Sequence, residues 1–246
     1  MKLRVPDKRR LLRQLAQLEP KLLRARVHEM NTLYDTPDGS LARHGQMLRL
    51  RVERPAPRAW GAGRRRKTGS GKARIPVLLT FKGPAKGGPA KEGPAKGRKA
   101  SKPGVYKIRE ENELRIPDRG DALRILEALG VRPWFRYEKF REVFGLRGMR
   151  LLKLALDETP IGVFVELEGR REEINRAAKL LGFARSDYIN KSYGALFMEE
   201  RGLAGRASHK EPVPFSGVPD MVFGSARGLR KGRTGSGAGR TGSGES

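Results

Sequence analysis

Cysteine is absent from this chain of 246 residues, and aromatic residues make up only 7% of it. A protein without thiols forms no disulfide, and it offers neither a thiolate zinc site nor a cysteine nucleophile. Its three histidines do not have the spacing of metal ligands. A metal ion would therefore have to be held by carboxylate oxygens.

Long apolar runs are also missing. No stretch approaches the roughly 18 apolar residues that cross a bilayer, and residues 1–17 lack the apolar core of a signal peptide. Hydrophobic residues still make up 37% of the chain, which is enough for a folded core. We therefore expect a cytoplasmic protein that does not enter membranes.

Acidic residues are scarce, with 27 of them against 53 basic residues, and the net charge is +26. Three low-complexity segments carry much of the surplus: residues 53–74 have eight basic and one acidic residues, residues 83–103 six and one, and residues 202–246 seven and three. Such segments bury too little apolar surface to offset the entropy of ordering. We expect disordered insertions at about 54–74 and 83–103 within one domain, residues 1–201, followed by a disordered basic tail, residues 202–246. The remaining surplus favours an anionic ligand.

Alternating polar and apolar residues predict eight β-strands, at about residues 2–5, 24–35, 46–53, 75–82, 105–116, 134–144, 151–157 and 162–168. Helices are expected from Asp7 to before Pro20, from Asp118 to Gly130, before Gly182, and at 190–200. This succession predicts an α+β fold, in which an eight-stranded antiparallel β-barrel forms a tunnel with peripheral α-helices.

Pairs of like-charged residues two positions apart recur within these strands. The pairs are Arg49–Arg51 and Lys139–Arg141, which are basic, and Glu111–Glu113 and Glu166–Glu168, which are acidic. Because strand side chains alternate between faces, both members of a pair point the same way. One pair alone is compatible with a solvated strand face, but the recurrence of both signs indicates a charged interior. Such an interior suits a phosphate-bearing ligand and its magnesium ion.

Longer motifs follow one another in a fixed order. They are His28-Glu-Met-Asn-Thr-Leu-Tyr-Asp-Thr-Pro37, Leu48-Arg-Leu-Arg51, Leu79-Thr-Phe-Lys-Gly-Pro84, Arg109-Glu-Glu-Asn-Glu113, Lys139-Phe-Arg141, Leu156-Asp-Glu158, Phe164-Val-Glu-Leu-Glu168 and Lys191-Ser-Tyr193. The ordered set resembles the CYTH superfamily, the triphosphate tunnel metalloenzymes, and within it the bacterial class IV adenylyl cyclase-like proteins. The resemblance covers residues 2–200.

The resemblance implies a tunnel that binds a triphosphate and holds Mg²⁺ or Mn²⁺ through inward carboxylates. The basic residues that it assigns to the phosphates are Lys2, Arg49, Arg51, Lys82, Arg109, Lys139 and Arg141, with Lys191 as a weaker addition. The carboxylates that it assigns to the metal are Glu111, Glu113, Asp157, Glu166 and Glu168. Without a ligand, Arg49 and Arg51 would face a hydrated lumen and have no ionic partner.

One part of the family pattern is missing. The family begins with a Glu-x-Glu-x-Lys signature, but here Met1 precedes Lys2 and both glutamates are absent. We expect them to be encoded upstream of a start codon that was assigned too late. If the chain truly begins at Met1, part of the metal site is lost, and a non-catalytic role becomes the alternative.

The resemblance implies an enzyme of the adenylyl cyclase type, which would convert ATP to cyclic AMP and pyrophosphate through alignment and charge neutralisation. A triphosphatase that cleaves inorganic or thiamine triphosphate is an alternative that would use the same tunnel. A polyphosphate or nucleotide sensor is a further alternative. Non-specific association with RNA through the basic loops also stays open.

Overall fold

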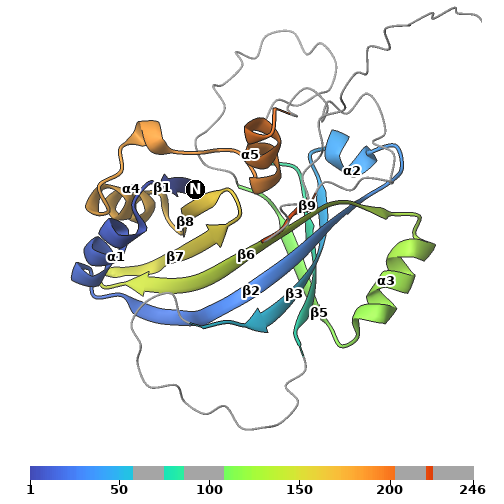
Figure 1. Cartoon of the computed structure of the whole chain (residues 1–246), viewed down its shortest axis with the longest axis horizontal. Helices are drawn as coiled ribbons and strands as arrows, with labels where there is room; N and C mark the ends of the chain where they lie inside the picture. Colours follow the sequence, from blue (N-terminus) through green and yellow to red (C-terminus); the bar gives the residue numbers. More distant parts are fainter. Residues whose placement is uncertain (58–74, 86–107, 203–219, 224–246) are drawn as a thin grey trace, which may run out of the picture.

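The computed structural model describes residues 1–57, 75–85, 108–202 and 220–223 (Figure 1). The strands are β1 (Lys2–Val5), β2 (Lys21–Asp35), β3 (Met47–Pro55), β4 (Val77–Lys82), β5 (Glu111–Ile116), β6 (Arg132–Leu146), β7 (Met149–Thr159), β8 (Gly162–Glu168) and β9 (Asp220–Met221). The helices are α1 (Lys8–Gln17), α2 (Ser40–Arg43), α3 (Arg119–Ala128), α4 (Arg171–Leu180) and α5 (Tyr193–Glu200), with a 3₁₀ turn at Arg185–Asp187.

The strands form one sheet in the order β1-β8-β7-β6-β2-β3-β4-β5. Each neighbouring pair in this order is antiparallel, and β9 pairs with β6 in parallel. The long strands β2 and β6 run through the middle of the curved sheet (Figure 1). The predicted class, an eight-stranded antiparallel sheet with peripheral helices, is confirmed. In the described part of the chain no ladder joins β5 to β1, so backbone pairing does not close the sheet there.

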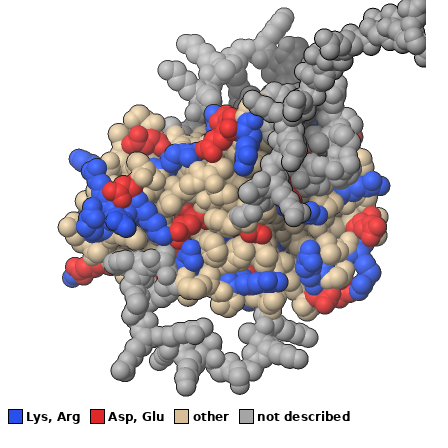
Figure 2. All heavy atoms as spheres, viewed as in Figure 1, with Lys and Arg blue, Asp and Glu red and all other residues tan. Residues whose placement is uncertain are grey.

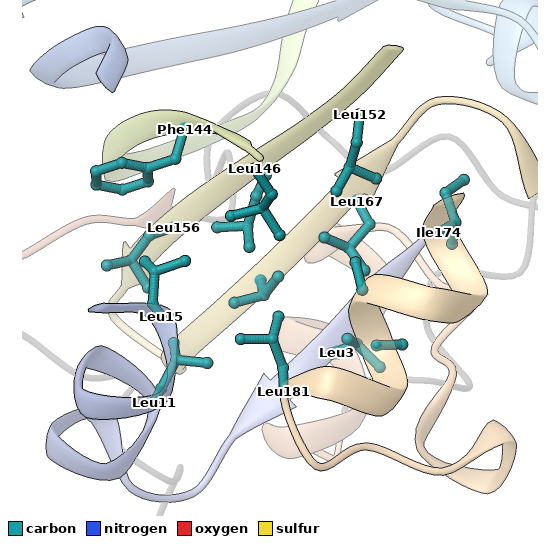
Figure 3. Close-up of a cluster of buried hydrophobic side chains, with 14 of the residues drawn as sticks. Leu3, Leu11, Leu15, Phe144, Leu146, Leu152, Leu156, Leu167, Ile174 and Leu181 are labelled. Atoms are coloured by element: carbon teal, nitrogen blue, oxygen red, sulfur yellow. The ribbon is translucent and has the colours of Figure 1, made fainter. Parts of the chain in front are cut away.

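The helices α1 and α4 cover one face of β1, β7 and β8 (Figure 3). Leu11 and Leu15 of α1 and Ile174 of α4 pack with Leu154 and Leu167, which are completely buried. The buried leucines of β7 and β8 stand at alternate positions, so they all point toward the helices. We call this helix-covered side of the sheet the outer face and the opposite side the inner face.

Two further apolar clusters complete the core. At the other end of the sheet, Ala122 and Leu126 of α3 pack on the outer face against β2, β3 and β4. On the inner face, Tyr193 and Phe197 of α5 pack against Phe164 of β8 and residues of β6. The helix α5 therefore covers part of the inner face near β9 (Figure 1).

Local sequence signals account for most helix starts. Asp7 accepts the backbone N–H of Arg10 at 3.0 Å, and Asp118 accepts that of Asp121 at 3.1 Å, so both residues cap helices that begin where the sequence predicted. Strand ends differ more: β2 begins at Lys21, and β5 begins at Glu111 instead of at residue 105. Residues 105–107 lie outside the described ranges.

A short piece of the predicted tail is part of the sheet. Asp220 and Met221 pair with Arg136 and Tyr137 of β6, and Met221 is only 1% exposed. This corrects the expectation of disorder at residues 220–223, because the apolar Met221 side chain packs with Tyr193 and Phe197 of α5 in the apolar cluster on the inner face. Most of the two insertions and the rest of the tail lie outside the described residues. Within the described ranges, no helix is both long and apolar enough to span a membrane.

Candidate functional site

Charged and polar side chains line the inner face at alternate strand positions. Asn31 of β2, for example, lies directly opposite Arg51 of β3 and Tyr137 of β6. We call the set the inner cluster; its members are Lys2, Glu29, Asn31, Arg49, Arg51, Glu53, Thr80, Tyr137, Lys139, Arg141, Asp157 and Glu166. Strand periodicity therefore did predict that Arg49 shares a face with Arg51, and Lys139 with Arg141.

Asp157 is the most strongly bonded carboxylate of the inner cluster. It is completely buried, and it accepts hydrogen bonds from Lys139 Nζ at 3.0 Å, from Arg141 Nε at 2.6 Å and from Tyr193 Oη at 2.7 Å. Arg141 also bonds Glu166 on the neighbouring strand. Burial lowers the pKa of Arg141, but Asp157 and Glu166 outweigh it and hold that pKa well above its usual value.

Lys2 lies at the edge of the inner cluster beside α5. Its ammonium is 3.5 Å from Glu166 and 3.7 Å from the centre of the Tyr193 ring, and it donates to the backbone carbonyl of Lys191 at 2.9 Å. Burial lowers the pKa of Lys2, and Glu166 offsets this only in part. Burial also raises the pKa of Tyr193, and Asp157 raises it further, so its hydroxyl stays a donor.

Glu29 is a second buried carboxylate, which the sequence reasoning did not single out. Its oxygens lie 3.3 Å from Arg51 Nη1 and 3.6 Å from Lys139 Nζ. Burial by itself would raise the pKa of Glu29, but Lys139, Arg141 and Arg51 lower it to about 2. The signal was present in the sequence, since Glu29 alternates with Asn31 on β2 just as the predicted pairs do.

Arg49 and Arg51 are not the unpaired cations that the sequence led us to expect. Arg51 Nε donates to Asn31 at 3.1 Å, and its Nη1 lies 3.4 Å from Glu53, which also bonds Arg24. Arg49 Nη2 donates to the Thr80 hydroxyl at 3.1 Å. The correction has a simple reason: a buried guanidinium is costly without hydrogen bonds and a compensating charge.

Other predicted residues lie at the margin of the inner cluster. Lys82 pairs with the exposed Glu111 at 2.7 Å on β5. Glu113 is also exposed and accepts from Thr80 at 3.0 Å. Arg109 precedes β5, and its buried Nε has no hydrogen-bond partner among the described residues. These residues line the β4–β5 side of the sheet.

Two predicted residues are not brought into the inner cluster. The Lys191 side chain donates to Glu199 at 2.5 Å, and only its backbone carbonyl reaches Lys2. Glu168 is exposed at the end of β8, where it lies opposite Lys153.

A model of the CYTH domain matches residues 1–193, which is more than half of the chain. The chain belongs to the CYTH domain family. Family members are enzymes that act on triphosphates, among them adenylyl cyclase-like proteins and triphosphatases, and they use divalent metals.

Solved structures share this CYTH fold. A protein from Pyrococcus horikoshii has a TM-score of 0.55 at 21% identity, over 81% of this chain and 98% of its own. A candidate adenylate cyclase from Vibrio parahaemolyticus has a TM-score of 0.54 at 20% identity, over 80% of this chain and 95% of its own. A candidate adenylyl cyclase from Hippeastrum, with a dominant triphosphatase activity, has a TM-score of 0.50 at 21% identity, over 81% and 94%. These likenesses show the fold alone. No curated protein matches the chain.

The five carboxylates predicted to bind metal do not come together. In the described ranges, no group of three or more His, Asp or Glu side chains is placed to hold a metal ion. Asp157 and Glu166 do meet, because both bond Arg141, whereas Glu111 and Glu113 lie on β5 at the edge of the sheet. Mg²⁺ commonly takes one or two protein carboxylates and completes its shell with water and substrate phosphates. Asp157 and Glu166 fit that role for an ion that arrives with its phosphate ligand.

Proposed function

We propose that this CYTH protein is a metal-dependent enzyme that processes a triphosphate, with an adenylyl cyclase-like conversion of ATP to cyclic AMP and pyrophosphate as the leading reaction. The observation that carries the proposal is a set of five cations on one face, of which Lys2, Arg49, Arg51 and Lys139 are buried and Arg141 is 12% exposed. Cations buried at this density are retained against a large desolvation cost, which fits a polyanionic substrate.

The chain's own residues would act mainly by alignment and charge. Arg49 and Arg51 would hold phosphate oxygens with two N–H donors each, and Lys139 and Arg141 would neutralise charge that develops on the leaving pyrophosphate. Asp157 and Glu166 would hold Mg²⁺ or Mn²⁺, which supplies further neutralisation of the phosphates. In the cyclase reaction the 3′-hydroxyl of ATP attacks the α-phosphorus, and pyrophosphate leaves.

A triphosphatase is the second candidate. The same cations would bind inorganic or thiamine triphosphate, with water attacking the terminal phosphoryl group. The structurally similar protein from Hippeastrum has a dominant triphosphatase activity, which supports this reaction as the second candidate.

One product assay distinguishes the candidates. The full chain is incubated with ATP, inorganic triphosphate and thiamine triphosphate, each with Mg²⁺, Mn²⁺ or a chelator. Cyclic AMP with pyrophosphate identifies a cyclase, and orthophosphate identifies a triphosphatase. Binding of all three ligands with no turnover under any metal condition would leave a sensor as the function and contradict the proposed enzyme.

A further inference from the structure

Glu29 occupies an unusual position in the middle of the sheet. It is completely buried on β2, directly opposite Glu53 of β3 on one side and Lys139 of β6 on the other. Two carboxylates directly opposite each other on adjacent strands repel. A glutamate at this position therefore requires nearby cations, and these are the cations of the proposed phosphate site.

The cations that approach Glu29 lie farther from its oxygens than the donors of Asp157 lie from the Asp157 oxygens. Arg51, Lys139 and Arg24 approach its oxygens at 3.3, 3.6 and 3.7 Å, but neither oxygen accepts a hydrogen bond from the described residues. Asp157, in contrast, accepts hydrogen bonds at 2.5 to 3.0 Å from Lys139, Arg141 and Tyr193. Glu29 therefore neutralises part of the charge of Arg51 and Lys139 without holding their N–H groups in hydrogen bonds.

Arg51 and Lys139, the cations next to Glu29, each have N–H donors that could bind a further acceptor. Arg51 shares one guanidinium nitrogen between Glu29 and Glu53, and Lys139 has only one hydrogen-bond acceptor among the described residues, Asp157. An ammonium carries three donors and a guanidinium five. Both side chains therefore have donors left for phosphate oxygens while they stay close to Glu29.

We propose that Glu29 is the resident counter-ion of the phosphate site, a positioning residue that neutralises Arg51 and Lys139 before the triphosphate binds and limits how tightly phosphates are held. The inference rests on the proposed function, since it assigns Glu29 a role in that same site. Its consequence is that substrate binding is weaker, and product release faster, than the number of cations alone would give.

The sign of the affinity change tests this role. Glu29→Gln keeps the shape of the side chain but removes its charge. We expect the full-length variant to bind inorganic triphosphate about tenfold more tightly in calorimetry without metal, because one more cation is left uncompensated. We also expect kcat and KM to fall together, because product phosphates are retained. Glu29→Asp restores the charge, so its affinity should return toward that of the wild type.

A matched control is available on the other side of the sheet. Glu142 of β6 is 1% exposed and lies opposite Leu156, which packs against the outer-face helices. Glu142→Gln removes an equally buried negative charge away from the phosphate site. We expect it to leave the affinity for inorganic triphosphate unchanged.

The outcomes separate this inference from the proposed function. Absence of triphosphate binding by the wild type overturns the proposed function. Binding by the wild type with equal or weaker binding by Glu29→Gln overturns the counter-ion role, since a residue that only orients Arg51 would weaken binding when removed. If Glu29→Gln does not fold, the affinity for inorganic triphosphate is compared between the single variant Arg51→Gln and the double variant Glu29→Gln/Arg51→Gln. The double variant should bind inorganic triphosphate more tightly than Arg51→Gln does. Equal or weaker binding by the double variant also overturns the inference.

Discussion

Arg51 and Arg54 lie on the same strand, β3, but on opposite faces, and only Arg51 is buried. Arg51→Gln should weaken binding of inorganic triphosphate about tenfold or more, since a bidentate cation is lost. It should also lower the free energy of unfolding by about 1 to 3 kcal/mol, because Glu29 and Glu53 lose a shared partner. Arg54→Gln, the matched control, should change both quantities little. Calorimetry and urea unfolding measure the two effects, and equal losses for both variants would contradict the inner-face assignment.

Glu29 also predicts a dependence of stability on pH. Its folded-state pKa of about 2 lies below the usual value of 4.5, so the carboxylate contributes stability above pH 4.5 and loses it as the pH falls toward 2. The shift corresponds to roughly 3 kcal/mol as an upper estimate. Between pH 5 and about 3, the wild type should therefore lose more unfolding free energy than Glu29→Gln does. Parallel stability curves for the two proteins in urea would show that Glu29 titrates normally.

Among the secondary-structure elements, β9 is held in place by β6, which lies far from it in the sequence, and by packing under α5. Met221 fills the cluster between α5 and β6, whereas Asp220 beside it is exposed. Met221→Ala should cost about 2 to 4 kcal/mol of unfolding free energy, since it leaves a cavity among Phe135, Tyr137 and Phe197. Asp220→Ala should change stability by less than about 0.5 kcal/mol. Wild-type stability for Met221→Ala in urea would mean that β9 does not dock in solution.

The surface charge of the whole molecule predicts non-specific binding of polyanions such as RNA, separate from triphosphate turnover. Figure 2 shows Lys and Arg side chains across the visible face, with a dense group at the end where Figure 1 places α1. Residues 224–246, which follow β9 in the sequence, add five basic residues and one acidic residue. Segments rich in Lys and Arg bind polyanions largely through counterion release.

Deleting residues 224–246 should therefore lower non-specific RNA binding and its salt dependence while triphosphate turnover survives. The deletion spares β9, which deletion of the entire tail from residue 202 would remove together with its packing. Filter binding at several salt concentrations, beside the turnover assay, measures both effects. Loss of turnover in a folded truncated protein would mean that the tail contributes to the active site.

The sequence alone determined the succession of β1 to β8, the positions of α1, α3, α4 and α5, and the side of each strand that carries charge. It did not predict α2 or β9. The features that it determined are local properties: alternation fixes which residues share a face, and Asp7 and Asp118 cap helices through neighbouring backbone amides. This is why Arg49, Arg51, Lys139 and Arg141 could be assigned to one lining before their strands were placed. The ordered motifs also placed the chain in the CYTH family.

The tertiary structure decided which of these charges meet. Strand order puts β2 between β3 and β6, and this brings Glu29 against Arg51 and Lys139, a pairing that no local pattern encodes. Packing of α5 on the inner face brings Tyr193 onto Asp157, and strand order places the carboxylates of β5 at the far edge of the sheet. The physical reason is that periodicity specifies the direction of a side chain, while the partner it reaches depends on pairing between strands far apart in the sequence.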